Sequence, residues 1–307
     1  MLRAAARFEV SEQFVEKDYY VTEILRIVAE RLGDKVIFKG GTSLSKGWGL
    51  IKRFSEDIDL FVNAQMFDPA PGVHKMDAIL KQLSEAVAQH PALTWLDEGQ
   101  TLGGFGREDY FEYNSRFDEL PRIRPAVRLE PGVQSGTFPT EVVPITSMVG
   151  QFLLEEGRDD MADDLMGFDM TLLHFRRTFV EKMFALHGKV VRLIEEGEPI
   201  ERHARHYSDL YALSDENEVR AMLASEEYAD IRNDYDVTSR GSKHLARIYR
   251  PPADLSFRDS PAFFPDTELK KQLALDYETQ CRLLFSKTSY PSFDEVLSRF
   301  EELRNLL

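Results

Sequence analysis

The 307-residue sequence predicts an α/β (α+β) protein with a domain of strands and helices over residues 1–150 and a mainly helical domain over residues 151–307. Three observations support this prediction. The length favours two domains over one. Short strand-like segments separated by glycine and proline recur up to about residue 150. Beyond that point helical periodicity accounts for most of the chain.

The first half of the sequence alternates helical and strand signals. Helical spacing over 11–32, with Ser11 as a possible N-cap, precedes a strand at 35–39. We expect the following elements in order: a short helix at 42–50, a strand at 57–62, a helix at 74–90, and strands at 93–99, 110–117 and 125–132. In the second half, apolar residues over 171–194 and the segment 202–213 indicate further helices.

Two segments allow more than one interpretation. The glycine-rich run at 103–106 has no strand immediately before it and no helix after it, so it predicts a hairpin connection rather than a phosphate loop. The acidic run at 155–169 is consistent with a solvated turn or with a surface for a basic partner.

Composition describes an ordinary globular protein, with 43% hydrophobic and 30% charged residues. The single cysteine, Cys281, excludes an internal disulfide and a cysteine-rich zinc site and fits a reducing cytoplasm. Charged residues precede any apolar run long enough for a signal peptide, and the apolar segment 142–154 is too short to cross a bilayer. We therefore expect a cytoplasmic protein without a membrane partner.

The formal net charge of −15 argues against indiscriminate binding to nucleic acid, because phosphate backbones are held mainly by lysine and arginine. Basic residues nevertheless gather in two patches, at 171–192 and 237–250. These patches suit either a short, localised contact with an anion or two solvated helix faces.

The segment 38–62 has the pattern of a phosphate site. Gly40 and Gly41 end a strand, and a helix beginning at Thr42 or Ser43 would point its free N–H groups toward the same place. The hydroxyls of Thr42, Ser43 and Ser45 would add short donors. This half of the site is expected to bind an anion.

The next strand has the pattern of a metal site. Alternation places Asp57 and Asp59 on one face, about 7 Å apart, while Ile58 and Leu60 enter the core. Two such carboxylates repel each other unless a cation lies nearby, and Mg²⁺, or Mn²⁺, takes oxygen ligands of this kind. By the same alternation in the 126–130 segment, Glu130 is the candidate for a third carboxylate.

The glycine pair, the short helix and the Asp57-Ile58-Asp59-Leu60 run together resemble the signature of DNA polymerase beta-type nucleotidyltransferases. More narrowly, "GGTSLSK" followed by "RFSEDIDL" resembles the AbiEii family, the nucleotidyltransferase toxins of AbiE-like toxin–antitoxin systems, which include the MenT toxins. "RRTFVEKMFALHG" (176–188) and "RHARHYSDLYAL" (202–213) are similar to later motifs of that family. The resemblance extends from about residue 12 to the C-terminal segment.

The resemblance implies a polymerase beta-type domain with a mixed sheet, followed by a helical domain, with the active site in the cleft between them. It implies an NTP donor, release of pyrophosphate, a metal-dependent reaction, the 3′ end of tRNA as acceptor, blocked translation, and a cognate antitoxin as partner. The residues expected to be catalytic are Asp57, Asp59, Glu130, Lys182 and Asp209, with Asp57 and Asp59 holding the metal. Those expected to bind the nucleotide are Gly40, Gly41, Thr42, Ser43, Arg53, Ser55 and Lys182. Those expected to contact the acceptor or its phosphates are Arg177, Arg205 and His206.

Two features depart from the family pattern. The 15-residue spacer between Gly41 and Asp57 is longer than in the general polymerase beta signature, although it suits the AbiEii form. His206 stands where many relatives carry aspartate. Without the resemblance, Lys182 and Asp209 would be interpreted as an ordinary surface ion pair.

Two other functions remain open from the sequence. The same site could transfer nucleotides to a small molecule or to a protein, or the chain could be a non-catalytic nucleotide-binding regulator. Transfer of labelled nucleotide and its loss on substitution of Asp59 would distinguish these alternatives.

Overall fold

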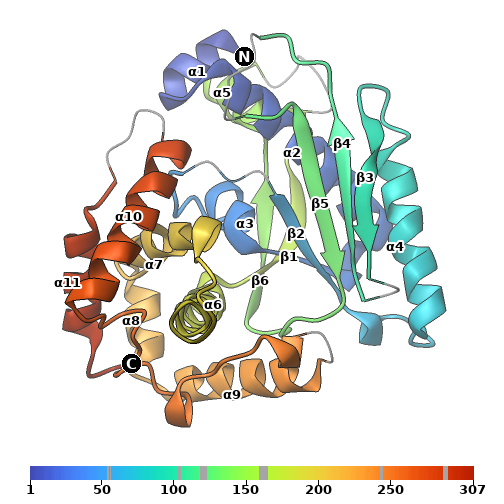
Figure 1. The fold of residues 1–307 in the computed structure, drawn as a ribbon. Coiled ribbons are helices and arrows are strands. Elements are labelled where there is room, and N and C mark those ends of the chain that lie inside the picture. The colour runs from blue at the N-terminus through green and yellow to red at the C-terminus, as the bar shows by residue number, and fades with distance from the viewer. Residues whose placement is uncertain are drawn as a thin grey trace. The chain divides into compact units, whose positions relative to one another are not determined.

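A mixed β-sheet organises the first part of the chain in the computed structural model, which describes residues 1–53, 55, 57–102, 105–117, 123–158, 165–242, 245–285 and 290–307 (Figure 1). The strands among these residues are β1 (Val36–Lys39), β2 (Asp57–Val62), β3 (Thr94–Thr101), β4 (Arg107–Glu112), β5 (Ala126–Gly132), β6 (Thr140–Ile145) and β7 (Phe168–Leu173). Their order across the sheet is β3-β4-β5-β2-β1-β7-β6. The β2–β5 and β1–β7 pairs are parallel and the other neighbours are antiparallel.

The described residues form two compact units. Unit 1 contains 1–49 and 54–173, and unit 2 contains 50–53 and 174–307. The predicted boundary at residue 150 precedes β7, whose pairing with both β1 and β6 returns the chain to the sheet of unit 1.

The helices of unit 1 are α1 (Leu2–Phe8), α2 (Glu12–Leu32), α3 (Gly40–Lys46), α4 (Val73–Val87) and α5 (Met148–Glu155), with single 3₁₀ turns η1 (Gly33–Lys35) and η2 (Ala64–Met66). The hydroxyl of Ser11 accepts a hydrogen bond from the backbone N–H of Phe14 and so caps α2 at the position expected from the sequence.

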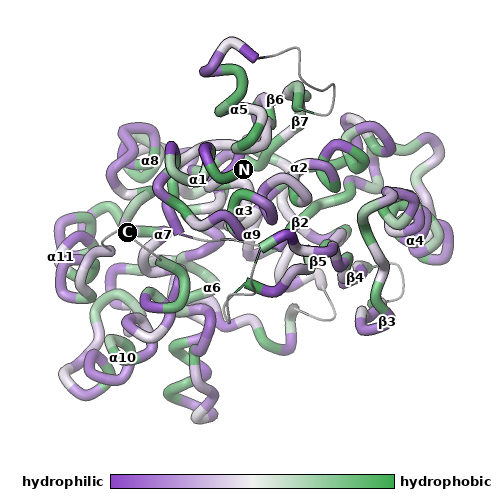
Figure 2. Tube along the Cα trace, turned by 90° about the horizontal axis from the view of Figure 1, so that it is seen from above, coloured by the Kyte–Doolittle hydropathy of each residue, from purple (hydrophilic) through white to green (hydrophobic). Residues whose placement is uncertain are grey.

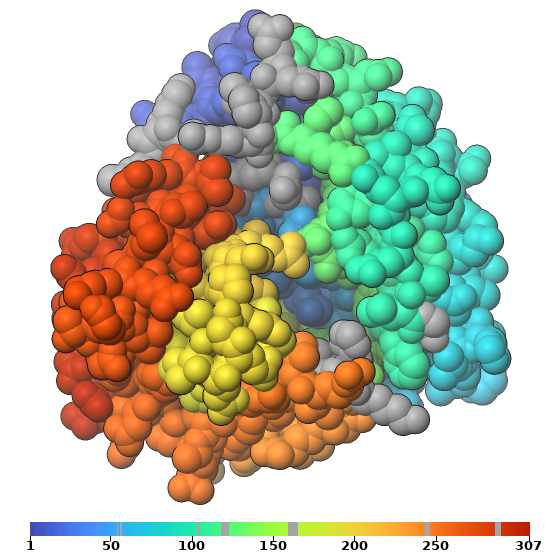
Figure 3. Space-filling model, in the orientation of Figure 1, coloured from blue at the N-terminus to red at the C-terminus, as the bar shows by residue number. Residues whose placement is uncertain are grey.

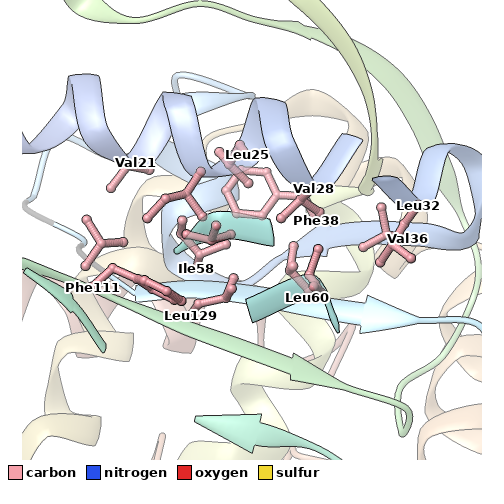
Figure 4. Packing of buried hydrophobic residues seen from close by; sticks show 14 of the residues in the cluster. Val21, Leu25, Val28, Leu32, Val36, Phe38, Ile58, Leu60, Phe111 and Leu129 are labelled. Atoms are coloured by element: carbon pink, nitrogen blue, oxygen red, sulfur yellow. The ribbon is translucent and has the colours of Figure 1, made fainter. Parts of the chain in front are cut away.

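One face of the sheet is covered by α2 and α4. Side chains of α2 such as Leu25 and Val28 point toward Phe38 of β1 and Ile58 of β2, and all of these are fully buried (Figure 4). Met76, Leu80 and Leu83 of α4 join the same cluster. Because side chains alternate along a strand, burying Ile58 and Leu60 on this face directs Asp57 and Asp59 to the opposite one.

Unit 2 is helical among its described residues. Its helices are α6 (Phe175–Glu196), α7 (His206–Leu213), α8 (Asn217–Leu223), α9 (Glu226–Gly241), α10 (Thr267–Leu284) and α11 (Phe293–Leu303), with 3₁₀ turns η4 (Glu201–Arg205), η5 (Leu245–Arg247) and η6 (Ala253–Leu255). Hydrophilic and hydrophobic stretches alternate along α10 and α11 in Figure 2, as expected of helices with one buried face.

The predicted fold class, a mixed-sheet α/β domain followed by a mainly helical region, is confirmed. Residues 171–173, which the sequence pattern places at the start of a helix, belong to β7, and α6 begins at Phe175. The predicted hairpin glycines 103–104 and residues 159–164 of the acidic run lie outside the described residues. In the part of the chain that is described, no helix is long and apolar enough to cross a membrane.

Candidate active site

The turn from β1 into α3 brings Gly40 against Asp59. Gly40 has a φ of +78°, and a Cβ added to it would lie 2.0 Å from Oδ2 of Asp59. Lys39, just before the turn, pairs with Asp59 in the antiparallel β1–β2 ladder. Glycine is therefore required at position 40 both for its backbone conformation and to leave room for the carboxylate.

Hydroxyl groups fasten α3 to the start of β2. The Thr42 hydroxyl donates to the Asp57 carbonyl oxygen at 2.5 Å and lies 2.9 Å from Oγ of Ser55. The Ser43 hydroxyl donates to the Gly40 carbonyl at 2.9 Å. Thr42 and Ser43 are buried, so in this conformation both hydroxyls bond to backbone oxygens and hold the turn in place.

Asp57, Asp59 and Glu130 share one face of two neighbouring strands. In the parallel β2–β5 ladder Asp57 pairs with Arg128 and Asp59 with Glu130. Alternation along both strands therefore places all four side chains on the face opposite α2. The three carboxylates that the sequence assigned to the site are thus brought together.

Arg128 lies at the centre of these acids. Its Nε and Nη2 donate to the two carboxylate oxygens of Asp57 at 3.0 and 2.7 Å, and Nη2 lies 2.6 Å from Oε1 of Glu130. Nη1 lies 3.4 Å from Oε1 of Glu108, which also accepts from the Tyr110 hydroxyl. Arg128 had no role in the sequence-based prediction, although the alternation that selected Glu130 puts it on the same face.

The charge balance on this face is negative. Burial raises the pKa of Glu130 to about 7, and the nearby Asp59 carboxylate adds to that increase while Arg128 opposes it. Oε1 of Glu130 is buried and accepts no hydrogen bond of good geometry. Glu130 is therefore a buried carboxyl group with a raised proton affinity beside a second carboxylate.

The donor set fits Mg²⁺ or Mn²⁺, because it consists of carboxylate oxygens. Across the described residues, no three acidic, histidine or cysteine side chains are already arranged as a metal site. Both oxygens of Asp57 bond to Arg128, so a metal bound there would have to replace the guanidinium at Asp57.

A second cluster of predicted residues lies within unit 2. Arg53 donates to both carboxylate oxygens of Asp209, from Nε at 2.5 Å and from Nη2 at 2.8 Å. Nζ of Lys182 lies 2.8 Å from Oδ2 of Asp209 and 3.1 Å from Nδ1 of His206. Arg53, Lys182 and Asp209 are all buried.

Proton affinities in this cluster follow from burial and from its charges. Burial lowers the pKa of Lys182, although Asp209 opposes that change. Burial would raise the pKa of Asp209, but Arg53 and Lys182 hold it well below its usual value. Burial, followed by Lys182, lowers the pKa of His206 well below its usual range. Arg53 and Lys182 therefore share the Asp209 carboxylate beside a neutral imidazole.

The remaining predicted contacts in unit 2 have different surroundings. Arg177 is fully buried and pairs with Glu181 at 2.8 Å and with Asp234 at 2.6 Å. Arg205 ends η4, and its charge lowers the pKa of both Lys182 and His206. Arg205 is thus near the Lys182 cluster, whereas Arg177 connects α6 to α9.

A family model described as "Nucleotidyl transferase AbiEii toxin, Type IV TA system" matches residues 23–299, which is most of the chain. The chain belongs to the AbiEii family. The resemblance drawn from the glycine turn and the Asp57-Ile58-Asp59 run is confirmed. As a family member the protein is a nucleotidyltransferase toxin of a type IV toxin–antitoxin system.

Among solved structures, this AbiEii protein is similar to MenT4, the nucleotidyltransferase toxin Rv2826c from Mycobacterium tuberculosis H37Rv. The two are 16% identical, each chain is covered to 97%, and the TM-score is 0.46. No curated protein matches the chain.

Proposed function

We propose that this AbiEii protein transfers a nucleotidyl group from an NTP to the 3′ end of tRNA, and that the modified tRNA no longer supports translation. The observation that carries the proposal is the packing of Asp59 against Gly40, with Asp57 and Glu130 on the same face of the sheet. Family membership supplies the class of reaction. A cytoplasmic location follows from the proposed acceptor.

In this proposal Asp57 and Asp59 hold Mg²⁺ or Mn²⁺. When bound, the metal would shield the negative charge of the NTP phosphates. The backbone at Gly40 and Gly41 would approach those phosphates closely because neither residue has a side chain. Thr42, Ser43 and Ser55 would keep that turn in position through the hydrogen bonds that join α3 to β2.

At the α-phosphorus the reaction forms one bond and breaks one. The acceptor hydroxyl oxygen forms a bond to the α-phosphorus, the bond from that phosphorus to the bridging oxygen of the β-phosphate breaks, and pyrophosphate leaves. Glu130 would accept the proton of the acceptor hydroxyl. Its position beside Asp59 in the β2–β5 ladder supports this role.

The Lys182 cluster would bind phosphate charge. The grouping of two basic side chains, Lys182 and Arg53, around Asp209 supports this role. Asp209 would hold Lys182 in position, and His206 and Arg205 would contact the acceptor or its phosphates. All of these residues belong to unit 2, and the proposed role concerns that unit alone.

The decisive experiment incubates the purified chain with each of the four α-labelled NTPs, Mg²⁺ and purified tRNA. Label on tRNA with at least one nucleotide is expected, and Asp59→Asn should abolish it. Label on protein or small molecules instead would support the alternative acceptors. Absence of label from all fractions, with NTP still bound, would identify a non-catalytic nucleotide-binding protein.

Family membership also implies an antitoxin partner. The net charge of −15 would suit a basic surface on that partner. Co-expression with a candidate antitoxin should relieve growth arrest caused by the parent chain, and Asp59→Asn should cause no arrest to relieve.

A further inference from the structure

A pocket in unit 2 lies where the two basic sequence patches meet. Its lining includes Lys189 and Arg192 from α6, and Tyr249 and Arg250 from the segment after η5. The volume of this cavity is about 180 Å³. In Figure 3 the yellow atoms of α6 lie against the orange atoms of the region that contains α9 and this segment. Basic residues of both patches thus line one pocket.

Aromatic side chains form one wall of the pocket. The Phe184 and Tyr235 rings stack with centroids 4.5 Å apart and an interplanar angle of 19°. Tyr249 lies 6.1 Å from each of them. The exposed side chain of Ile248 extends this wall. A flat ring such as a nucleobase has favourable contacts with a surface of this kind.

The cations of the pocket are not equally available to a ligand. Arg250 pairs with Glu195 and Glu196, and Arg192 pairs with Glu196 and Glu198. Lys189 has no ion pair or hydrogen bond to any residue that the structure describes. Its charge is therefore the one in the pocket that a single phosphate would neutralise.

The pocket continues toward the Lys182 cluster. His203 lines the pocket, and its ring lies 5.7 Å from that of His206, which contacts Lys182. Lys182 and Lys189 are seven residues apart on α6, so they lie on the same side of the helix two turns apart. Burial, followed by the charge of Lys189, lowers the pKa of His203 to about 4, so the imidazole on this side of the pocket is neutral near pH 7.

We propose that this pocket binds an unpaired nucleotide of an RNA strand, with its phosphate at Lys189 and its base against the wall that contains Tyr235 and Tyr249. The inference rests on the proposed function and deepens it, since the site would hold the acceptor strand next to Lys182. A duplex is disfavoured because, among the described residues, the pocket offers one unpaired cation, and the chain is acidic overall.

The test measures binding of a 5′-fluorescein single-stranded ribohexanucleotide to the full chain by fluorescence anisotropy, with EDTA and without NTP. Lys189→Gln should weaken binding by roughly tenfold at low salt and reduce the slope of log affinity against log salt by about 0.7. Tyr249→Leu should weaken binding by roughly tenfold, whereas Tyr249→Phe, which keeps the ring, should bind like the parent. Lys271→Gln, at an exposed lysine of α10, is the matched charge control.

Unfolding midpoints of all variants establish that each is folded. Two outcomes would then contradict the inference. Binding that Lys189→Gln and Tyr249→Leu leave unchanged would overturn the inference. Displacement of the strand by AMP at concentrations equal to those of unlabelled hexanucleotide would also overturn it, because the pocket would then be a site for free nucleotide.

The outcomes also separate this inference from the proposed function. Asp59→Asn should lose transfer but keep binding of the hexanucleotide, because Asp59 belongs to unit 1. A chain that transfers label to tRNA yet binds RNA independently of Lys189 would refute the inference alone. A chain that binds RNA through Lys189 but never transfers label would refute the proposed function alone.

Discussion

The carboxylate of Asp59 occupies the space that a side chain at Gly40 would need, since a Cβ at that position would lie 2.0 Å from Oδ2 of Asp59. Gly40→Ala must therefore displace either the turn or the carboxylate, and it adds about 1 kcal/mol of strain at positive φ. We expect nucleotidyl transfer to fall by about 100-fold or more, because a displacement on the order of 1 Å in an active site has that effect. Steady-state transfer to tRNA measures it.

Gly197→Ala is the matched control for this prediction. Gly197 follows the last residue of α6 at a φ of +71°, and no atom lies within 4 Å of the position that a Cβ would take there. The variant should lose about 1 kcal/mol of stability and keep its activity. Equal activity losses in the two variants would show that backbone strain, and not contact with Asp59, is responsible.

Removing Arg128 should make the chain respond more strongly to divalent metal. Arg128→Gln removes the guanidinium that bonds to both oxygens of Asp57, so we expect a loss of about 3 kcal/mol of stability. Mn²⁺ should then raise the thermal unfolding midpoint of this variant more than that of the parent.

Arg107→Gln provides the comparison, because Arg107 pairs with Asp109 elsewhere in the same sheet, at 2.9 and 3.0 Å. Its midpoint should rise with Mn²⁺ no more than that of the parent. If Mn²⁺ shifts the midpoints of Arg128→Gln and the parent equally, Arg128 does not compete with the metal for Asp57.

Lys182 and Asp209 should differ in what they do for stability. Asp209→Asn removes the buried negative charge that Arg53 and Lys182 share, at a cost of about 3–5 kcal/mol. Lys182→Met leaves the Arg53–Asp209 pair intact and should change stability by about 1 kcal/mol or less, while transfer is lost. Urea unfolding and transfer assays on both variants provide the comparison, and wild-type transfer by a folded Lys182→Met chain would exclude a role for this lysine.

Stability should decrease below neutral pH because of buried histidines. Burial lowers the pKa of His187, whose Nδ1 lies 2.7 Å from Oγ of Ser260, to about 4. The unfolded chain takes up the proton below a pH of about 6.5, whereas the folded chain does so only near pH 4. The free energy of unfolding therefore falls as pH decreases between these values, by up to about 1.4 kcal/mol per pH unit for this group.

Denaturant unfolding at pH 7 and pH 5 tests this prediction. His187→Gln carries no titrating group at this position, so its stability should fall less between the two pH values than that of the parent. Equal decreases in both chains would mean that His187 has the same pKa in the folded and unfolded states, which contradicts the prediction.

Local sequence patterns were sufficient to predict which strand residues are buried and where α2 begins. Alternation correctly separated buried Ile58 and Leu60 from the face that bears Asp57 and Asp59, and Ser11 caps α2 as its position suggested. These features depend on residues close together in the chain. The sequence could therefore indicate them without knowledge of the fold.

Long-range pairing could not be predicted in the same way. The parallel pairing of β7 with β1, which places residues 168–173 in the sheet, joins segments more than 100 residues apart. The ion pair between Arg53 and Asp209 spans 156 residues. The role of Arg128 was missed for a different reason. Alternation along the strand predicts which face of the sheet bears Arg128, but it does not predict that the guanidinium bonds to Asp57.

Lys182 and Lys189 lie on one continuous 22-residue helix, α6, so the helix fixes the distance between them. Seven residues at 1.5 Å each set the two positions about 10.5 Å apart along the axis. A molecule that touches both must match that length, and a one-residue insertion between them would rotate one lysine by about 100° away from the other. The distance between two lysines on the same side of α6 could therefore change only in steps of about one helical turn.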